Sequence, residues 1–397
     1  ADQRARWRKN EMKTKILRLI MATFILSTHS GAAAESSAGG CFRLDKIQGR
    51  HTLVDPRGAP FFTLGINHIN AVHEDAKHDL LTEAFDGSMG AYSSAAVADL
   101  KAWSYNTAGY GSPEEIYPLI AYMEDSFLER NSNYLSDEEF FYPDIFDPKV
   151  QAEKLNKLKW MCRNKNNPNL IGYYWTDTPQ WDLERSLHTR GTNWVIAIRE
   201  LPEQAPGRIR YERFLSDCAD EGIQATDEDF LGIIAQEHYK LIGEATRRLH
   251  PNALIFGERY LMHDHPSVVL EAAMPYIDIL SIQPGSDQFE EDYFDALYKS
   301  YGKPIIICDH QCSFPTPEYS ETMWKQLESE SAVAEMYRNY VAAAVAKPYI
   351  IGYHRCQYID RYNEYPGVLK QGILREDGSE YKILEAAITA ANASALK

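Results

Sequence analysis

The sequence predicts an α/β protein built as a single (β/α)8 TIM barrel, with an N-terminal β-hairpin and long βα loops. First, short β-branched or aromatic runs alternate with amphipathic helical segments along most of the chain. Second, several of these runs end in a polar or charged residue, as barrel strands do at the face that carries the site. Third, 397 residues without an internal repeat fit one large barrel with insertions.

The first 34 residues are expected to be a leader. A basic segment follows Met12, residues 16–26 are apolar but too short to span a bilayer, and Ala32-Ala33-Ala34 offers a small-residue cleavage site. A membrane anchor remains the alternative for this segment. The expected organisation is therefore a leader at 1–34 and one catalytic domain at 35–397, in a secreted or periplasmic protein.

The chain is acidic, with 57 Asp and Glu against 41 Lys and Arg and a formal net charge of −16. Such a balance argues against nucleic acid and anionic membrane surfaces as partners. It favours a soluble protein acting on a neutral substrate, although a local basic pocket for a sulfated sugar is compatible with it. The 25 tyrosines suit contact with carbohydrate. We expect a carbohydrate substrate as the partner, and the oligomeric state stays open.

The six cysteines show no spacing typical of a small disulfide scaffold. Cys308 and Cys312 flank Asp309 and His310, but the remaining ligands that a zinc site needs are not nearby. We therefore expect these two cysteines to be small buried residues or one disulfide bridge. No metal and no cofactor are predicted.

The N-terminal part of the domain reads as a hairpin at 42–61 followed by the first barrel strand at 61–68. Asp55-Pro56-Arg57-Gly58 is a turn signal, and the hairpin is expected to cover the bottom of the barrel. Asn67 and His68 fall at the C-terminal end of the first strand, where such barrels keep their sites.

Strand four and the loop after it form the most informative stretch. Residues 171–177 are aromatic and β-branched, and the run ends at Asp177 before Pro179. A long insertion follows at 182–226. The other expected elements are, in order, helix 93–103, strand 105–110, strand 119–127, helix 149–164, helix 227–250, strand 254–260, strand 277–283, strand 303–310, helix 332–346, strand 349–358 and helix 381–391.

Three carboxylates end predicted strands: Asp177 on the fourth, Glu258 on the fifth and Asp309 on the seventh. Glycoside hydrolysis needs two carboxyl groups across a sugar-sized gap, one protonated and one ionised. The ends of strands four and seven lie nearly opposite each other across a barrel mouth. We predict Asp177 as the general acid and Asp309 as the base or nucleophile. Glu258 is a further catalytic candidate that could instead pair with Arg259.

The residues predicted to bind substrate share a place at or just beyond a strand. They are Asn67, His68, Asn106, Tyr110, Trp175, Trp181, Gln283, His310, His354 and Gln357. Trp175, Trp181 and Tyr110 are the proposed sugar platforms among them. His68 and His354 could equally be packed structural histidines.

Several short motifs resemble successive landmarks of clan A glycoside hydrolases, in particular β-agarases and related enzymes of marine galactans. They are Gly65-Ile-Asn67-His68, Asn106-Thr-Ala-Gly-Tyr-Gly, Ile171-Gly-Tyr-Tyr, Lys303-Pro-Ile-Ile-Ile-Cys-Asp309, Gly352-Tyr-His354 and Lys370-Gln-Gly-Ile-Leu. The resemblance covers residues 42 to 391. It implies a (β/α)8 barrel that cleaves a β-glycosidic bond, plausibly in a galactan.

The sequence departs from the clan at both catalytic positions. Strand four usually ends in Asn-Glu, and here the matching pair is Asp177-Thr178. Strand seven usually ends in Glu, and here it ends in the shorter Asp309. A wider gap between the carboxyls would fit an inverting mechanism. Two alternatives stay open: a lapsed barrel that binds glycans without hydrolysis, favoured by Thr178, and a metal-dependent hydrolase that uses Asp309, His310 and His354.

Overall fold

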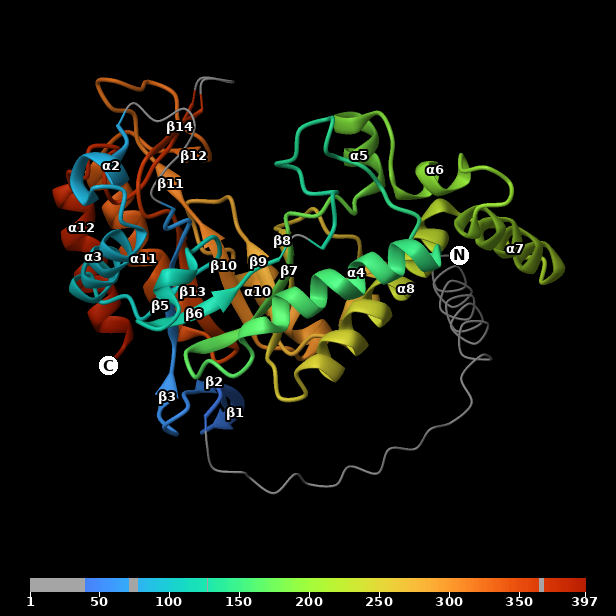
Figure 1. Cartoon of the computed structure of the whole chain (residues 1–397), viewed down its shortest axis with the longest axis horizontal. Coiled ribbons are helices and arrows are strands. Elements are labelled where there is room, and N and C mark those ends of the chain that lie inside the picture. Colours follow the sequence, from blue (N-terminus) through green and yellow to red (C-terminus); the bar gives the residue numbers. More distant parts are fainter. Residues whose placement is uncertain (1–39, 71–77, 127, 364–367) are drawn as a thin grey trace. The chain divides into compact units, whose positions relative to one another are not determined.

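Eight parallel strands close into a barrel in which the last strand pairs with the first. The computed structural model describes residues 40–70, 78–126, 128–363 and 368–397, so the expected leader lies outside the described residues. The predicted (β/α)8 barrel is confirmed (Figure 1). Its strands in chain order are β4 (Thr63–Asn67), β5 (Thr107–Ala108), β6 (Ala121–Glu124), β7 (Leu170–Asp177), β8 (Ile255–Leu261), β9 (Leu280–Gln283), β10 (Ile305–His310) and β13 (Ile350–Cys356).

Helices surround this barrel and connect its strands. The α-helices are α2 (Leu80–Phe85), α3 (Met89–Ala102), α4 (Pro148–Met161), α5 (Leu183–Arg190), α6 (Trp194–Arg199), α7 (Pro206–Asp220), α8 (Asp227–Leu249), α9 (Ser267–Ala273), α10 (Glu291–Tyr301), α11 (Glu330–Ala346) and α12 (Lys382–Ala395). Helix α4 begins where the sequence predicts, because the Asp147 carboxylate accepts from the Lys149 amide at 2.8 Å and Pro148 takes the first helical position. The stretch at 182–226 is largely helical, since it holds α5, α6 and α7.

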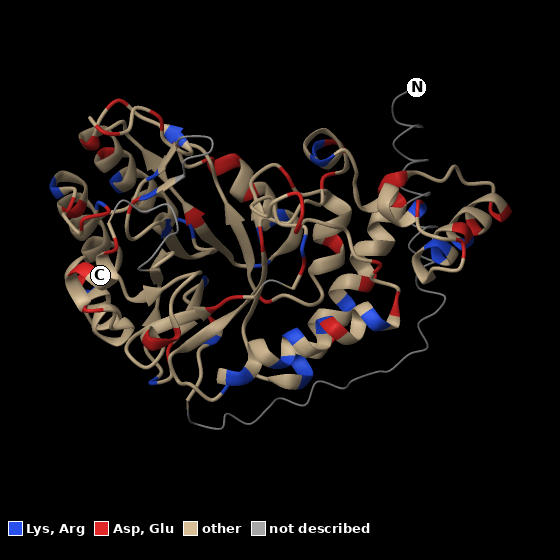
Figure 2. Cartoon of the chain, turned by 45° about the horizontal axis from the view of Figure 1, so that its top comes forward, with Lys and Arg blue, Asp and Glu red and all other residues tan. Residues whose placement is uncertain are grey.

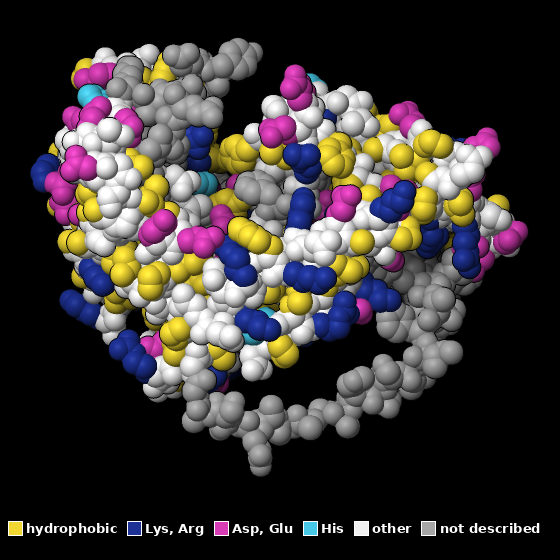
Figure 3. All heavy atoms as spheres, viewed as in Figure 1, with side chains coloured by type: hydrophobic (Ala, Val, Ile, Leu, Met, Phe, Trp, Pro, Cys, Tyr) yellow, Lys and Arg dark blue, Asp and Glu magenta, His cyan; other side chains and the backbone are white. Residues whose placement is uncertain are grey.

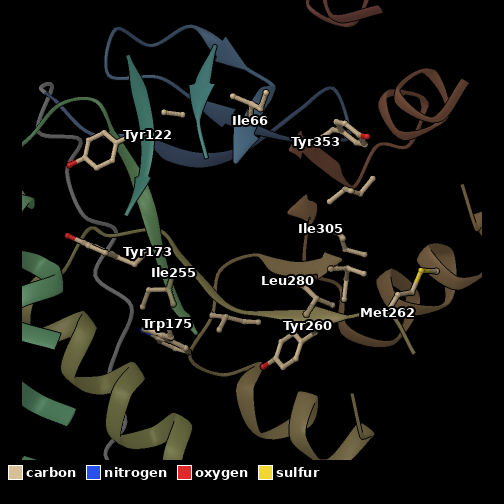
Figure 4. Packing of buried hydrophobic residues seen from close by; sticks show 14 of the residues in the cluster. Ile66, Tyr122, Tyr173, Trp175, Ile255, Tyr260, Met262, Leu280, Ile305 and Tyr353 are labelled. Carbon is tan, nitrogen blue, oxygen red and sulfur yellow. The ribbon is translucent and has the colours of Figure 1, made fainter. Parts of the chain in front are cut away.

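The main hydrophobic core lies between the strands and the surrounding helices. In Figure 4, Ile255, Leu280, Ile305 and Tyr353 lie in this layer. A smaller cluster fills the barrel interior and includes Met123, Ile171, Tyr174, Phe256, Ile306 and Cys308. Strand residues that face inward near the C-terminal ends are polar instead, and they form the floor of the barrel mouth.

The two ends of the barrel are built differently. At the N-terminal end, β1 (Arg43–Ile47), β2 (Arg50–Val54) and β3 (Pro60–Phe61) form an antiparallel sheet. The predicted turn is present, with the Gly58 amide donating to the Asp55 carbonyl at 2.9 Å. The His51 amide donates to the Pro348 carbonyl at 2.8 Å, which ties this sheet to the start of β13.

The C-terminal end of the barrel is open. Two small sheets follow the last strands there: β11 (Cys312–Ser313) with β12 (Lys325–Gln326), and β14 (Arg361–Asn363) with β15 (Val368–Lys370). Figure 3 shows the surface hollowed between the part that carries these sheets and the part that carries α5. This hollow is the barrel mouth.

The six cysteines form no disulfide bridge. Cys308 and Cys312 are small buried side chains, so the alternative of a bridge between them was wrong. None of the helices in the described part of the chain combines the length and the apolar character that crossing a membrane requires. Acidic and basic residues are interspersed along the helices in the view of Figure 2.

Candidate active site

A buried arginine joins the two carboxylates that the sequence singles out. Nη1 of Arg259 lies 3.1 Å from Oδ1 of Asp177, and Nη2 lies 3.0 Å from Oδ2 of Asp309. The arginine is 0% exposed, and the two aspartates are 3% and 4% exposed. The ends of strands four and seven therefore carry an acid each, as expected, and the end of strand five supplies a cation between them.

Two predicted polar residues orient the acids. The Asn67 side-chain amide donates to Oδ1 of Asp309 at 2.7 Å and to the Cys308 carbonyl at 2.9 Å. The Gln283 side-chain amide donates to Oδ1 of Asp177 at 2.7 Å. Each carboxylate thus receives one charged and one neutral donor, which restricts its rotation.

Tyr110 forms the floor beneath the arginine. The central carbon of the Arg259 guanidinium lies 4.0 Å from the centroid of the Tyr110 ring, a cation–π geometry. Tyr110 is 3% exposed, so its ring supports the guanidinium. Tyr110 lies at the mouth, but its ring face is occupied by Arg259 rather than open to a sugar, which corrects the expectation of a platform there.

Gly257 explains why Arg259 faces the interior. Phe256 faces inward, so regular alternation would turn Glu258 inward and Arg259 outward. Gly257 has φ of 70°, and the pairing register with β7 shifts at this point. The irregularity inserts one residue and reverses the two side chains. A carboxylate expected at the mouth is replaced there by a cation.

Glu258 consequently lies on the helix side of the barrel wall. Its Oε2 accepts from the Trp181 indole at 2.7 Å and from the Tyr239 hydroxyl at 2.6 Å. Its Oε1 lies 3.2 Å from Nε2 of His238 on α8. These contacts correct the expectation that Glu258 stands at the mouth, and they place it away from Asp177 and Asp309.

Glu258 is one end of a buried charged network. Nδ1 of His238 lies 3.1 Å from Oε1 of Glu129, and that carboxylate also pairs with the ammonium of Lys154. All four side chains are 4% exposed or less. Burial lowers the pKa of Lys154 to about 7 and lowers that of His238 below its usual range. We call Lys154, Glu129, His238 and Glu258 the outer network.

Burial has the largest effect on the pKa of the acid at the end of strand four. Burial raises the pKa of Asp177 above its usual range and outweighs the opposing effect of Arg259, while the nearby charge of Asp309 adds to the rise. Burial also raises the pKa of Asp125, which follows strand three and accepts from the Gly111 amide at 3.0 Å. A carboxyl with a raised pKa is suited to donating a proton.

Thr178 cannot replace the acid that the clan carries at this position. Its hydroxyl bonds the side chains of Asn133 and Ser132, and it is fully buried. Its backbone has φ of 38°, in the left-handed region, and its amide donates to the Arg259 carbonyl at 3.0 Å. Thr178 carries no carboxyl, so Asp177 is the acid present at the end of strand four.

The two tryptophans do not line the mouth. Both are 0% exposed. Trp175 donates to the Thr246 hydroxyl on α8 at 3.1 Å, and in Figure 4 its ring lies among the core residues that face this helix. Trp181 stacks on Trp194 with 5.0 Å between ring centroids. Neither ring has a face open to a sugar, which corrects the expectation of two tryptophan platforms.

The histidines of strands seven and eight are also structural in their contacts. His310 lies 2.8 Å from both the Tyr353 hydroxyl and the Ser286 carbonyl, and burial lowers its pKa to about 4. His354 lies in the barrel interior, 2.8 Å from the Thr63 hydroxyl, and burial lowers its pKa to about 3. Within the described part of the chain, neither residue hydrogen-bonds Asp177 or Arg259, and both are buried, so neither is placed to bind a substrate hydroxyl.

Two further predicted binders support the backbone instead. Asn106 precedes β5 at the bottom of the barrel, where its side chain bonds the Leu64 amide and the Phe62 carbonyl at 2.9 Å each. The Gln357 side-chain amide donates to the carbonyls of Ile359 and Lys370 at 2.8 and 2.9 Å. Asn106 is therefore far from the mouth, and Gln357 anchors β15.

His68 stands at the rim of the mouth and is half-buried. Its side chain, Asp309 and Cys356 bring one potential metal-ligand atom each within 4.8 Å of one another. This set suits a cation poorly, because Asp309 already pairs with Arg259 and burial raises the pKa of the Cys356 thiol to about 12.

Three residues of the mouth were missed in the sequence: Arg259, Tyr134 and Lys370. A glycine inside a strand is a known signal of a bulge and could have pointed to Arg259. Tyr134 lies in the loop after strand three and is 46% exposed, and Lys370 lies 5.7 Å from the centroid of its ring. Burial of its hydroxyl raises the pKa of Tyr134, and the charges of Asp177 and Asp309 add to the rise. Lys370 opens the motif Lys370-Gln-Gly-Ile-Leu, but the motif alone assigns it no role, and no sequence pattern distinguishes Tyr134.

Comparison with known proteins supports the resemblance to β-agarases. No protein-family profile matches the chain. β-Agarase B of Vibrio sp. (strain JT0107) is 18% identical over an alignment of 427 positions, gaps included, that covers 81% of this chain and 44% of the relative. The chain thus spans less than half the length of this curated relative.

Solved structures share the fold. An exo-β-agarase superposes with a TM-score of 0.76 at 18% identity, covering 90% of this chain and 66% of that one. A second agarase gives a TM-score of 0.74 at 19% identity, covering 96% and 68%. A β-galacturonidase from Eisenbergiella tayi gives 0.55 at 14% identity, covering 89% and 54%. The expected similarity to β-agarases is confirmed at the level of the barrel.

Proposed function

We propose that this chain is a glycoside hydrolase that acts on an agar-type galactan, with Asp177 as the general acid and Asp309 as the base or nucleophile. The observation that carries the proposal is the pair of carboxyls at the ends of strands four and seven, held on either side of Arg259. The agar-type substrate is proposed because the similar proteins are β-agarases.

In this proposal, Asp177 donates its proton to the glycosidic oxygen as the bond to the anomeric carbon breaks. Asp309 either attacks that carbon or takes a proton from the water that does so. Hydrolysis should therefore decline as the pH rises through the raised pKa of Asp177, because the acid must carry its proton. The anomer of the first product separates the retaining from the inverting course.

A second candidate function is a lapsed barrel that binds glycans without cutting them. Thr178 supplies no carboxyl at the usual acid position, and the Arg259 ion pair favours the ionised form of Asp177. The contacts around Arg259 would then serve to hold a rigid binding floor.

The deciding experiment is the release of reducing ends from a panel of algal and plant galactans. The unmodified chain is compared with Asp177→Asn, Asp309→Asn and the control Asp292→Asn, which changes an exposed residue of α10. Cleavage that both site variants lose and the control keeps supports the hydrolase. Glycan binding with no cleavage by the unmodified chain supports the lapsed barrel.

We also propose secretion through the leader at 1–34, because a galactan polymer is met outside the cell. Appearance of the chain in the culture medium or periplasm, lost when residues 12–34 are deleted, is the expected result. Retention of the intact chain in the cell would contradict it.

A further inference from the structure

Lys370 is a buried cation at the mouth without a carboxylate partner at ion-pairing distance among the described residues. The residue is 7% exposed, and its ammonium lies beside the Cys356 thiol and 5.7 Å from the centroid of the Tyr134 ring. Its charge also acts on Asp177. The ammonium therefore lies near both the catalytic acid and an exposed aromatic ring.

This placement is unfavourable without an anionic partner. Burial of a charged side chain destabilises the folded chain unless the charge is paired, and buried lysines normally are paired. The main-chain anchor from Gln357 to the Lys370 carbonyl, at 2.9 Å, fixes the residue in this position. The cost is recovered if an anion binds beside the ammonium.

The strand that pairs with β15 carries a second cation, Arg361, which has no ion pair among the described residues. In the ribbon of β14 and β15, Arg361 is directly opposite Lys370, so their side chains leave the same face. Like charges in this relationship repel each other. Arg361 is half-buried and has no ion pair with any residue that the structure describes. Two cations therefore converge on one edge of the mouth in a chain whose formal net charge is −16.

We propose that the mouth binds a galactan carrying an anionic substituent, a sulfate ester or a carboxylate, and that Lys370 is the specificity-determining contact to that group. The inference rests on the proposed function, because it assumes that a galactan occupies the mouth. Tyr134 offers its exposed ring to the apolar face of the sugar, and Lys370 beside it takes the charge. A neutral galactan would satisfy Tyr134 but leave the ammonium without an anion.

The test measures binding separately from cleavage. Oligosaccharides of a sulfated agar-type galactan, the same preparation after chemical desulfation, and oligogalacturonate are titrated calorimetrically into the full chain carrying Asp309→Asn. We expect at least one anionic ligand to bind tenfold or more tightly than the desulfated one. The stronger of the two identifies sulfate or carboxylate as the group recognised.

Variants in the same background assign the effect to Lys370. Lys370→Met should remove the preference and leave the affinity for the desulfated ligand unchanged, while Lys370→Arg should retain the preference. Lys299→Met, on the exposed side of α10, is the control and should change neither affinity. Equal affinities of the unmodified site for all three ligands would overturn the inference. An equal loss for all ligands in Lys370→Met would also overturn it.

The two proposals fail in different ways. If the unmodified chain cuts no galactan but shows the Lys370-dependent preference, the proposal of a hydrolase is wrong and the proposal of an anionic ligand is supported. If the chain cuts a neutral galactan and shows no preference, the anionic ligand fails and the hydrolase stands. If Lys370→Met does not fold, the three ligands are compared on Lys370→Arg and on the chain that keeps Lys370. The presence or absence of a preference for the anionic ligands then decides the inference.

Discussion

Glu258 and Arg259 are neighbours in sequence, yet the barrel wall separates their side chains. Arg259 pairs with Asp177 and Asp309 inside the mouth, and Glu258 bonds Trp181 and Tyr239 on the side of the helices. The positive φ of Gly257 produces this arrangement. One backbone irregularity thus decides which charge reaches the site.

Gly257→Ala should destabilise the chain and disturb the mouth. The backbone has φ of 70°, and an added Cβ would come 2.8 Å from Cγ2 of Ile277. We expect a loss of about 1–3 kcal/mol in the free energy of unfolding, measured with urea. Gly232→Ala is the matched control, since its Cβ would meet only Val268 at 3.6 Å in a helix, where alanine is favoured. Equal stability of Gly257→Ala and the unmodified chain would contradict the account.

Arg259→Met should lower stability by an amount that grows with pH. Without the guanidinium, Asp177 and Asp309 face each other, so their folded-state pKa values rise above the unfolded values. The free energy of unfolding of the variant therefore falls as the pH rises through those pKa values. At pH 8 we expect a loss of about 3–5 kcal/mol relative to the unmodified chain, and a smaller loss at pH 5.

Urea unfolding at both pH values measures this difference. Arg185→Met is the control, because Arg185 pairs with Asp264 at a site where 41% of its side chain is exposed. Exposed pairs of this kind contribute about 0–1 kcal/mol. An identical loss for Arg259→Met at the two pH values would show that packing, not charge, explains its effect.

Glu258→Gln tests whether Glu258 stabilises the fold without taking part in the reaction. The substitution removes the charge that His238 faces and leaves a hydrogen-bond mismatch, so a loss of about 1–3 kcal/mol in unfolding free energy is expected. The turnover number should stay within about twofold, whereas Asp309→Asn should lower it by about 10²–10⁴-fold. If Glu258→Gln folds normally but its turnover number falls as far as that of Asp309→Asn, Glu258 takes part in the reaction.

Tyr134→Ala tests the platform that the structure offers in place of the tryptophans. The side chain is 46% exposed, so we expect less than about 0.5 kcal/mol of lost stability. Glycan affinity should fall about tenfold, which corresponds to about 1.4 kcal/mol of lost ring contact. Phe141→Ala is the control, since Phe141 belongs to the same loop and is 47% exposed. Equal effects of the two substitutions on affinity would argue against a specific platform.

Asp360 should make stability depend on pH near neutrality. Burial raises its pKa from 3.8 to about 7, against hydrogen bonds from the Gly372 amide and the Tyr381 hydroxyl. Between these values the folded chain holds a proton that the unfolded chain releases, so the unfolding free energy falls as the pH rises. Asp360→Asn should flatten this slope in urea titrations from pH 4 to pH 8. An unchanged slope would mean that another group is responsible.

The sequence predicts the barrel well because its signals are local and repeated. Buried runs such as Ile305–Ile307, and caps such as Asp147-Pro148, specify strands and helices without knowledge of the tertiary contacts. The ends of the strands are also readable from the sequence, and the structure brings Asp177, Asp309, Asn67 and Gln283 together around Arg259.

Side-chain direction is what the sequence left undetermined. A shift of one residue exchanges the inward-facing and outward-facing side chains of a strand. Because of the bulge at Gly257, alternation counted from the sequence gives the wrong direction for Glu258 and Arg259. The same limit applies to Trp175 and His310. Each lies close to the C-terminal end of its strand, but its side chain faces the surrounding helices. Tyr134 and Lys370 meet across loops that are distant in sequence, and no local pattern encodes such a meeting.

The outer network limits how this protein can diverge. Lys154, Glu129, His238 and Glu258 come from a helix, a loop, a second helix and a strand, and each side chain contacts the next within the core. Loss of one member leaves its buried neighbour without a partner, whereas loss of an adjacent pair removes both groups together. Descendants of this chain should therefore exchange these residues in pairs, and a lineage with only one altered should carry a second, compensating change nearby.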